Sequence, residues 1–217
     1  MELIRQHYGI IKPSPAAPAV MTVEPPQSGL KTVILRKEAQ APSYMAVWHV
    51  PGVKDADFAA LSILQKPLLE GESSRLYRRL VSEEQLALYV GGGIQQTIDP
   101  YLFTITVKPK PGADLDKVDR IIEEELARVK NEGITVKEYE KALNIIRSDF
   151  YGRMQTISGK ANSLGQAEIY FGDYGRLFTM IDEYAAAGPD KVKEAARKYF
   201  VENNKTLGKL IPEEGAK

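Results

Sequence analysis

The chain has 217 residues, 43% of them hydrophobic and 27% charged, which is ordinary for a globular protein with one sizeable core. Lys plus Arg and Asp plus Glu both number 29, so the charge balance points neither to nucleic acid nor to an anionic membrane surface. No apolar run approaches the roughly 20 residues of a membrane span. The absence of cysteine excludes disulfides and thiolate metal sites.

The first 30 residues change character abruptly. Residues 2–8 have the pattern of a helix end, whereas Lys12 to Gly29 contain five prolines and predict an extended linker. The helical stretch is too short to form a domain. We therefore expect residues 1–23 to be the tail of a preceding unit plus a Pro-rich linker, and residues 24–217 to form a single domain.

The next segment predicts two strands and a helix. KTVILRK (31–37) alternates like a strand, and SYMAVWHV (43–50) is apolar on both faces, as expected for a strand buried centrally in a sheet. A helical period over residues 55–69 should kink or stop near Pro67.

A short helix and a hairpin are expected after that. Residues 73–82 begin with two serines, which are good N-cap types, and show a helical apolar stripe. The stripe consists of Leu76, Leu80 and Val81, and the basic residues on its flanks and outer side are Arg75, Arg78 and Arg79. Strands at 87–96 and 101–108 then form a β-hairpin with one apolar face.

After Gly112 the apolar period switches to 3.6 residues and predicts a run of five helices. Gly133 ends the first, and Thr135 with Glu138 forms a capping box that opens the second. The later signals are Ser158 as the cap of a third helix, a short helix at 177–184, Pro189 in the first turn of the last helix, and a strand at 206–212. This order predicts an α+β fold: a mainly antiparallel sheet of about five to six strands with helices packed on one face.

No short motif supplies a self-contained active site. Gly91-Gly92-Gly93 lacks the Lys-Ser/Thr of a phosphate loop, and it predicts a bulge or the close approach of another backbone, which is compatible with peptide binding at a sheet. Glu83-Glu84 indicates a solvated helix end. Glu123-Glu124-Glu125 lies opposite an apolar stripe and indicates a solvated face.

The two histidines, His7 and His49, lie far apart in unlike contexts. A helical zinc site needs two imidazoles one turn apart and a carboxylate, and local spacing assembles no such set. His49 lies in the apolar run MAVWHV, where we expect a hydrogen-bonded core residue rather than a ligand. The sequence therefore predicts no catalytic residue, no metal ligand and no cofactor in this chain.

Several stretches together resemble the C-terminal half of pitrilysin/insulinase-type zinc peptidase subunits, the family that includes mitochondrial processing peptidase. They run in family order from about residue 24 to 212 and include LLEGESSRLYRRLVSEEQLALYVGGG, DPYLFTITVKPKPGADLDKV, EGITVKEYEKALNIIRSDF and KTLGKLIP. YGIIKPSPAAP resembles the link between the two homologous halves of such subunits. The preceding unit is then expected to be a homologous half.

In that family an inverted H-x-x-E-H helix and a distal glutamate hold zinc in the N-terminal half, and nothing here matches them. The resemblance implies that this chain is the half without metal. That half completes a clam-shaped arrangement of two domains and forms one wall of the substrate chamber between them. The parent protein is then expected to be a zinc-dependent metalloendopeptidase whose zinc lies in its other domain. The implied partners are that N-terminal half, a peptide substrate, and a homologous partner subunit or a second copy.

Some C-terminal halves of the family carry an arginine and, seven residues later, a tyrosine that help to hold substrate at the zinc. Aligned on Glu84 to Ala87, these positions fall on Val81 and Leu88, so the pair is absent in register. The neighbouring Arg79 and Tyr89 are weak candidates for substrate-chamber contacts. We expect a structural or chamber-rim role for them rather than a catalytic one.

Two alternatives compete with the peptidase interpretation. A non-catalytic homologue could serve as a scaffold or assembly subunit, and the chain could also be an independent peptide-binding module. An intact H-x-x-E-H upstream of Met1 would favour the peptidase, and a degraded one the scaffold. The compartment is not fixed by these residues, and a soluble protein of the cytoplasm or periplasm fits them.

Overall fold

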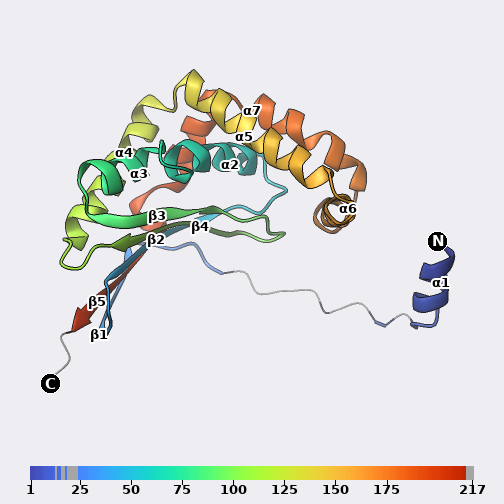
Figure 1. Ribbon diagram of the computed structural model, residues 1–217, viewed down its shortest axis with the longest axis horizontal. Helices are drawn as coiled ribbons and strands as arrows, with labels where there is room; N and C mark the ends of the chain where they lie inside the picture. Colours follow the sequence, from blue (N-terminus) through green and yellow to red (C-terminus); the bar gives the residue numbers. More distant parts are fainter. Residues whose placement is uncertain (13, 16–17, 19–23, 214–217) are drawn as a thin grey trace.

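The computed structural model describes residues 1–12, 14–15, 18 and 24–213. In that part of the chain, five strands form one sheet in the order β1-β5-β2-β4-β3, and the helices between residues 57 and 199 lie over one of its faces (Figure 1). Only the β1–β5 pair is parallel. The predicted α+β fold with a mainly antiparallel sheet is confirmed. Part of the predicted linker (13, 16–17 and 19–23) lies outside the described residues.

The elements have the following bounds. The strands are β1 (Lys31–Glu38), β2 (Ser43–Val50), β3 (Ala87–Ile94), β4 (Tyr101–Pro109) and β5 (Lys205–Glu213). The α-helices are α1 (Glu2–Tyr8), α2 (Asp57–Leu69), α3 (Arg75–Tyr77), α4 (Leu115–Glu132), α5 (Val136–Met154), α6 (Ile157–Phe171) and α7 (Met180–Tyr199). The other helical elements are a π-helical turn, η1 (Arg78–Glu83), and two 3-10 turns, η2 (Tyr174–Phe178) and η3 (Glu202–Asn204).

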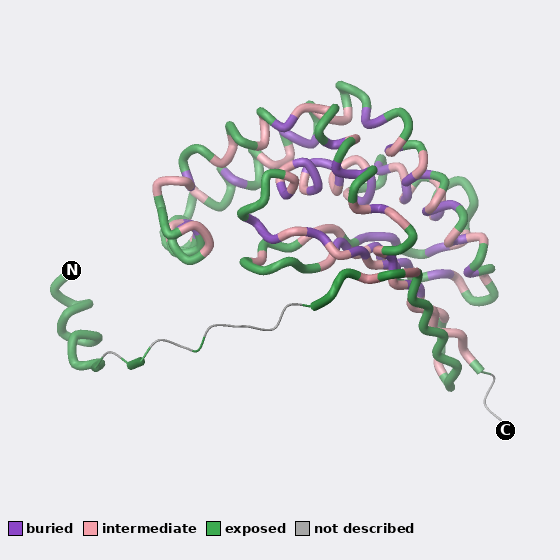
Figure 2. Tube along the Cα trace, turned by 180° about the vertical axis from the view of Figure 1, so that it is seen from behind, coloured by how far each residue is buried: buried purple, intermediate pink, exposed green. Residues whose placement is uncertain are grey.

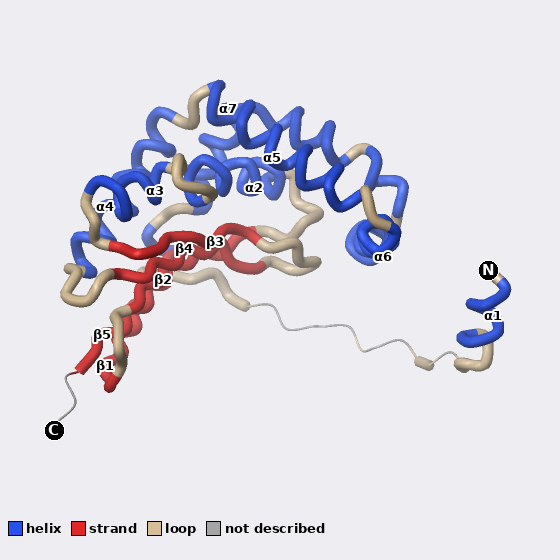
Figure 3. Tube along the Cα trace, viewed as in Figure 1, coloured by secondary structure: helices blue, strands red, loops and turns tan. Residues whose placement is uncertain are grey.

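The core lies between the sheet and the helices, where the buried segments of both layers face each other (Figure 2). Trp48 of β2 and Phe103 of β4 are buried, and both pack edge to face against Phe200, with ring centroids 5.2 and 5.0 Å apart. Figure 3 shows β1 and β5 continuing beyond the helical layer. Accordingly, no residue of β1 is buried.

The central position predicted for residues 43–50 is confirmed, because β2 pairs with both β4 and β5. The prediction that this strand is buried on both faces is wrong. Met45 is 45% exposed and the side chain of His49 is 39% exposed, since the helices cover only the other face of the sheet. His49 is therefore not a core residue, and its Nε2 lies 3.8 Å from a carboxylate oxygen of Glu24.

A buried polar cluster joins the sheet to α4. The Nζ of Lys205, a residue that is 5% exposed, lies 2.7 Å from Asp119 Oδ1 and 2.8 Å from Glu123 Oε1. The hydroxyl of Tyr44 donates to Asp119 at 2.5 Å. Burial, and then the hydrogen bond to Asp119, raise the pKa of Tyr44 above its ordinary value. The cluster ties β2 and β5 to the helical layer.

The helix boundaries follow the capping residues. The capping box of Thr135 and Glu138 is present as predicted. Thr156, not Ser158, caps α6, because the Thr156 side chain accepts from the Gly159 amide at 3.0 Å. The two last helices of the prediction are joined in α7, with a break at Gly188, whose φ of 68° suits glycine.

Candidate functional site

Strand β3 lies at one edge of the sheet and pairs, within the described residues, only with β4. At its end the Ile94 N–H turns away from β4 and donates to Oε1 of Gln65 at 3.1 Å. In an antiparallel ladder the outward groups alternate, so we expect Val90 and Gly92 to direct their main-chain groups to the same edge. Such an edge offers donors and acceptors to an extended chain.

The glycine run brings the edge strand close to its neighbour. Gly92 has a φ of +132°, and a Cβ there would lie 2.0 Å from the carbonyl oxygen of Thr104 on β4. Only glycine fits this position. The predicted close approach of another backbone is therefore confirmed at Gly92, and that backbone belongs to β4.

A β-bulge shapes the start of β3 rather than its glycine run. The register shifts between Ala87 and Tyr89, so Leu88 is the extra residue. As a result both Leu88 and Tyr89 are exposed, by 63% and 48%. The Tyr89 hydroxyl lies over Gly91, where a Cβ would be 2.1 Å away from it. The missing side chain at Gly91 thus makes room for the phenol on the strand surface.

Three adjoining cavities follow this edge, and we call them together the β3 groove. The first, of about 310 Å³, lies beside Tyr89 and Gly91. The second, of about 230 Å³, shares Gln65 with the first. The third, of about 430 Å³, shares Gln96 and Arg153 with the second. The groove therefore runs from the start of β3 to beyond its end.

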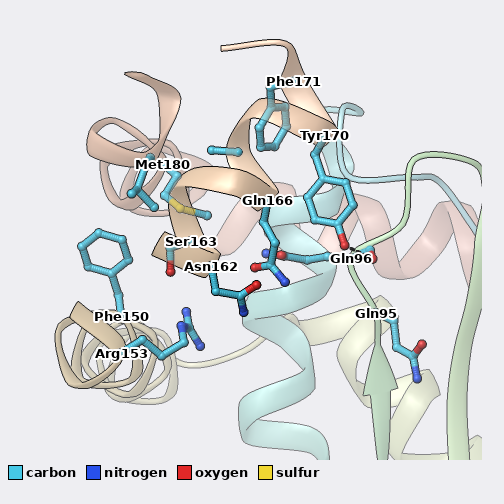
Figure 4. A pocket seen from close by; sticks show the side chains of 12 residues that line it. Gln95, Gln96, Phe150, Arg153, Asn162, Ser163, Gln166, Tyr170, Phe171 and Met180 are labelled. Atoms are coloured by element: carbon cyan, nitrogen blue, oxygen red, sulfur yellow. Dashed lines mark hydrogen bonds between the residues drawn. The ribbon is translucent and has the colours of Figure 1, made fainter. Parts of the chain in front are cut away.

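The third cavity, here called the Arg153 cleft, lies between the end of β3 and helix α6 (Figure 4). The Tyr170 hydroxyl donates to the carbonyl of Gln96 at 3.2 Å and links α6 to the hairpin. In Figure 4, Arg153 extends from the end of α5 towards Asn162 on α6. The cleft rests on a second, smaller core whose buried members are Phe150, Ala167 and Leu177.

Arg79 is turned to helix α4 and does not line the β3 groove. Its Nη1 lies 2.8 Å from Glu125 Oε1, and its Nη2 lies 2.9 Å from Glu124 Oε2. Hydrogen bonding to Glu124, and then to Glu125, raises the pKa of Arg79 although burial opposes the shift. Glu125 is only 2% exposed, so the prediction of a fully solvated Glu123–Glu125 face is wrong at this residue.

The structure thus separates the two residues singled out from the sequence. Tyr89 lies on the groove, whereas Arg79 is held by carboxylates against α4. Val81, at the position aligned with the family arginine, packs against the core. Leu88, at the position aligned with the family tyrosine, is the exposed bulge residue.

Residues 1–146 match the family described as the Peptidase M16 inactive domain. The chain belongs to this family. It is 28% identical to the Helicobacter pylori zinc protease PqqE over 163 residues, which are 74% of this chain and 37% of that protein. An uncharacterized zinc protease of Mycobacterium leprae is 26% identical over 211 residues, 96% of this chain and 46% of its own length. The chain thus spans less than half the length of these relatives.

Solved structures agree with this assignment. The crystal structure of a protease from Helicobacter pylori matches 97% of this chain and 52% of its own, with a TM-score of 0.90 and 25% identity. The inactive peptidase domain of a Bordetella parapertussis protein matches 84% of this chain and 97% of its own, with a TM-score of 0.73 and 28% identity. The M16 inactive domain fold is therefore shown.

The described residues of this M16 inactive domain do not fit a zinc ion. Among the described residues, no three His, Asp or Glu side chains gather where they could hold a metal. The same residues include no helix that is long and apolar enough to cross a membrane.

Sequence reasoning missed the Arg153 cleft of this M16 inactive domain. Its lining residues come from the loop after β3, from α5 and α6, and from the segment after α6, which are distant in sequence. The one local signal is Gln95-Gln96, because two carboxamides follow one residue after three glycines.

Proposed function

We propose that this chain is the non-catalytic C-terminal domain of a zinc metalloendopeptidase and that it binds extended peptide along the β3 groove. The observation that carries the proposal is the free edge of β3, with three cavities aligned beside it. The longer relatives named as zinc proteases support the activity of the parent protein. Zinc and the catalytic glutamate would lie in its N-terminal half.

The edge of β3 provides the affinity in this proposal. A peptide added as a further strand would hydrogen-bond to the outward main-chain groups, whatever its side chains. Tyr89 would contact the peptide directly from the strand surface. Arg79 would act at the rim, chiefly by holding the helical turn that precedes β3 against α4.

The remaining parts of the proposal concern the parent protein. Residues 1–23 would be the tail of a homologous half plus linker, and residues 24–217 would form the C-terminal domain. Together the two halves would wall a substrate chamber, with a homologous partner subunit or a second copy as a further partner. Composition and charge fit a soluble protein of the cytoplasm or periplasm without a nucleic-acid partner.

Alternate N-methylation of a peptide tests the strand addition. The probe is a peptide of about eight residues with alternating serine and valine, long enough to follow the groove at about 3.3 Å per residue. Two further peptides carry N-methyl groups on the odd or on the even residues. Isothermal titration calorimetry should show that one methylated frame binds at least about tenfold more weakly, because several hydrogen bonds of about 1 kcal/mol each are lost.

The two methylated peptides control for each other because they share composition and stiffness. Equal affinities for all three peptides would refute strand addition. If none of the three peptides binds, the proposed peptide-binding function is refuted, and the alternative of a scaffold or assembly subunit is favoured.

A further inference from the structure

We propose that the Arg153 cleft is an anion subsite that binds the carboxylate at the C-terminal end of a peptide held on β3. The inference rests on the proposed peptide binding and adds the direction in which the bound peptide runs. With its C-terminal end in the cleft, the peptide runs parallel to β3. The charges at the two ends of the β3 groove and the chemistry of the cleft lining support this direction.

Of the described residues, Arg153 is the only one with an ionised side chain that lines the cleft. Within the described residues its guanidinium has no carboxylate within 4.0 Å, whereas Arg75, Arg79 and Arg176 all form ion pairs. The Arg153 side chain is exposed and therefore accessible to a ligand. An unpaired guanidinium facing a cavity offers a carboxylate two parallel hydrogen bonds.

Carboxamides provide most of the other polar groups of the cleft. They belong to Gln95, Gln96, Asn162 and Gln166. Each carboxamide both donates and accepts, so together they can satisfy the last peptide units without adding a charge that would compete with Arg153. Ser163 adds a hydroxyl and is only 9% exposed. The lining thus suits a peptide main chain that ends in an anion.

The opposite end of the groove has the opposite charge. In the part of the chain that the structure describes, Glu70 and Glu72 are the only ionised residues that line the first cavity. Lys66 pairs with Glu70 at 2.5 Å, which leaves Glu72 without an ion pair in the described part of the chain. From Val90 to Gln96 an extended chain spans about 20 Å. A peptide of this length would meet Glu72 near its amino end and Arg153 at its carboxyl end.

The test compares two forms of the serine–valine peptide on the full chain. One has a free C-terminal carboxylate and the other a C-terminal amide. Calorimetry should show that the acid binds the wild type about tenfold more tightly, as expected for a charge-assisted hydrogen-bonded pair. With Arg153→Gln the two forms should bind equally, and the affinity for the amide should stay within about twofold of that of the wild type. Arg147→Gln, an exposed arginine on the same helix, should keep the wild-type difference.

A third peptide identifies the source of the carboxylate. It has an amidated end and a C-terminal glutamate. If this peptide binds the wild type as tightly as the acid does, and Arg153→Gln weakens that binding, the subsite accepts a side-chain carboxylate as well as the main-chain one. Weak binding of this peptide would restrict the subsite to the α-carboxylate.

The outcomes separate this inference from the peptide function. Acid and amide binding the wild type with equal, measurable affinity would overturn the anion subsite and leave the strand addition standing. A preference for the acid that survives Arg153→Gln would also overturn it. No binding of either form would overturn both proposals.

Discussion

Replacing Arg79 by methionine should destabilise the domain, because the arginine neutralises a buried carboxylate. Its partner Glu125 has a side chain that is only 3% exposed. Breaking a buried ion pair costs about 3–5 kcal/mol. Here Arg128 remains 3.2 Å from Glu125 on an exposed side chain, so we expect a loss of about 2–3 kcal/mol of unfolding free energy.

Urea unfolding and calorimetry measure this effect, and the melting temperature should fall by roughly 4–12 °C. Arg78→Met is the matched control. Arg78 is 64% exposed and, among the described residues, pairs with Glu83 alone, so its loss should cost less than about 0.5 kcal/mol. Adding Glu125→Gln to Arg79→Met should recover part of the stability, since the buried charge is then removed.

The affinity for the serine–valine peptide decides the role of Arg79. If Arg79 is structural, Arg79→Met lowers stability and leaves peptide affinity within about twofold at a temperature where the variant is folded. A stability loss below about 0.5 kcal/mol together with a large loss of peptide affinity would refute the reasoning. Arg79 would then be a direct chamber contact.

Three further substitutions test other features of the fold. Burial alone would raise the pKa of Glu138, but hydrogen bonds from Arg75 and Thr135 outweigh it and lower the pKa below its ordinary value. The ionised Glu138 therefore stabilises the folded state fully above about pH 4.5, and this contribution is lost as the pH falls through the lower pKa of the folded state. In acid titrations followed by circular dichroism, Glu138→Gln should lose stability less steeply than the wild type. Gly92→Ala should lower the unfolding free energy measured in urea by more than about 2 kcal/mol. Its control, Gly165→Ala, lies in a helix with open space at its Cβ and should be neutral or stabilising by up to about 1 kcal/mol. Equal effects of the two substitutions would contradict the geometry at Gly92. Lys205→Met should lower the unfolding free energy by about 1–2 kcal/mol, because the charge-assisted hydrogen bonds to Asp119 and Glu123 are lost although both carboxylates stay partly exposed. An unchanged unfolding free energy would contradict the cluster.

Local sequence signals predicted the parts of the fold that depend on local interactions. The capping box at Thr135 and the end of α4 at Gly133 follow from residues within one helical turn. The apolar alternation of residues 101–108 likewise predicted the buried face of β4. The cap of α6 was misplaced because Thr156 and Ser158 both supply a hydroxyl, and only the backbone geometry selects between them.

The features that sequence could not predict depend on contacts between distant segments. The burial of Glu125 requires Arg79, 46 positions away, to reach it across the helix pair. The exposure of His49 depends on which face of the sheet the helices cover. The bulge at Leu88 inserts one residue into β3 and so shifts the alternation of exposed and buried side chains along the strand. The sequence pattern alone does not show where such an extra residue lies. The Arg153 cleft combines the loop after β3 with segments from α5 to the start of α7, so it depends on such contacts as well.

Hydrogen exchange of the β3 amides tests the central claim most directly. Within the described part of the chain β3 and β1 are the two edges of the sheet. Saturating serine–valine peptide should slow exchange at the outward amides of Val90 and Gly92 and leave those of β1 unchanged. Unchanged exchange along β3, or protection that falls on β1 instead, would contradict peptide binding in the β3 groove.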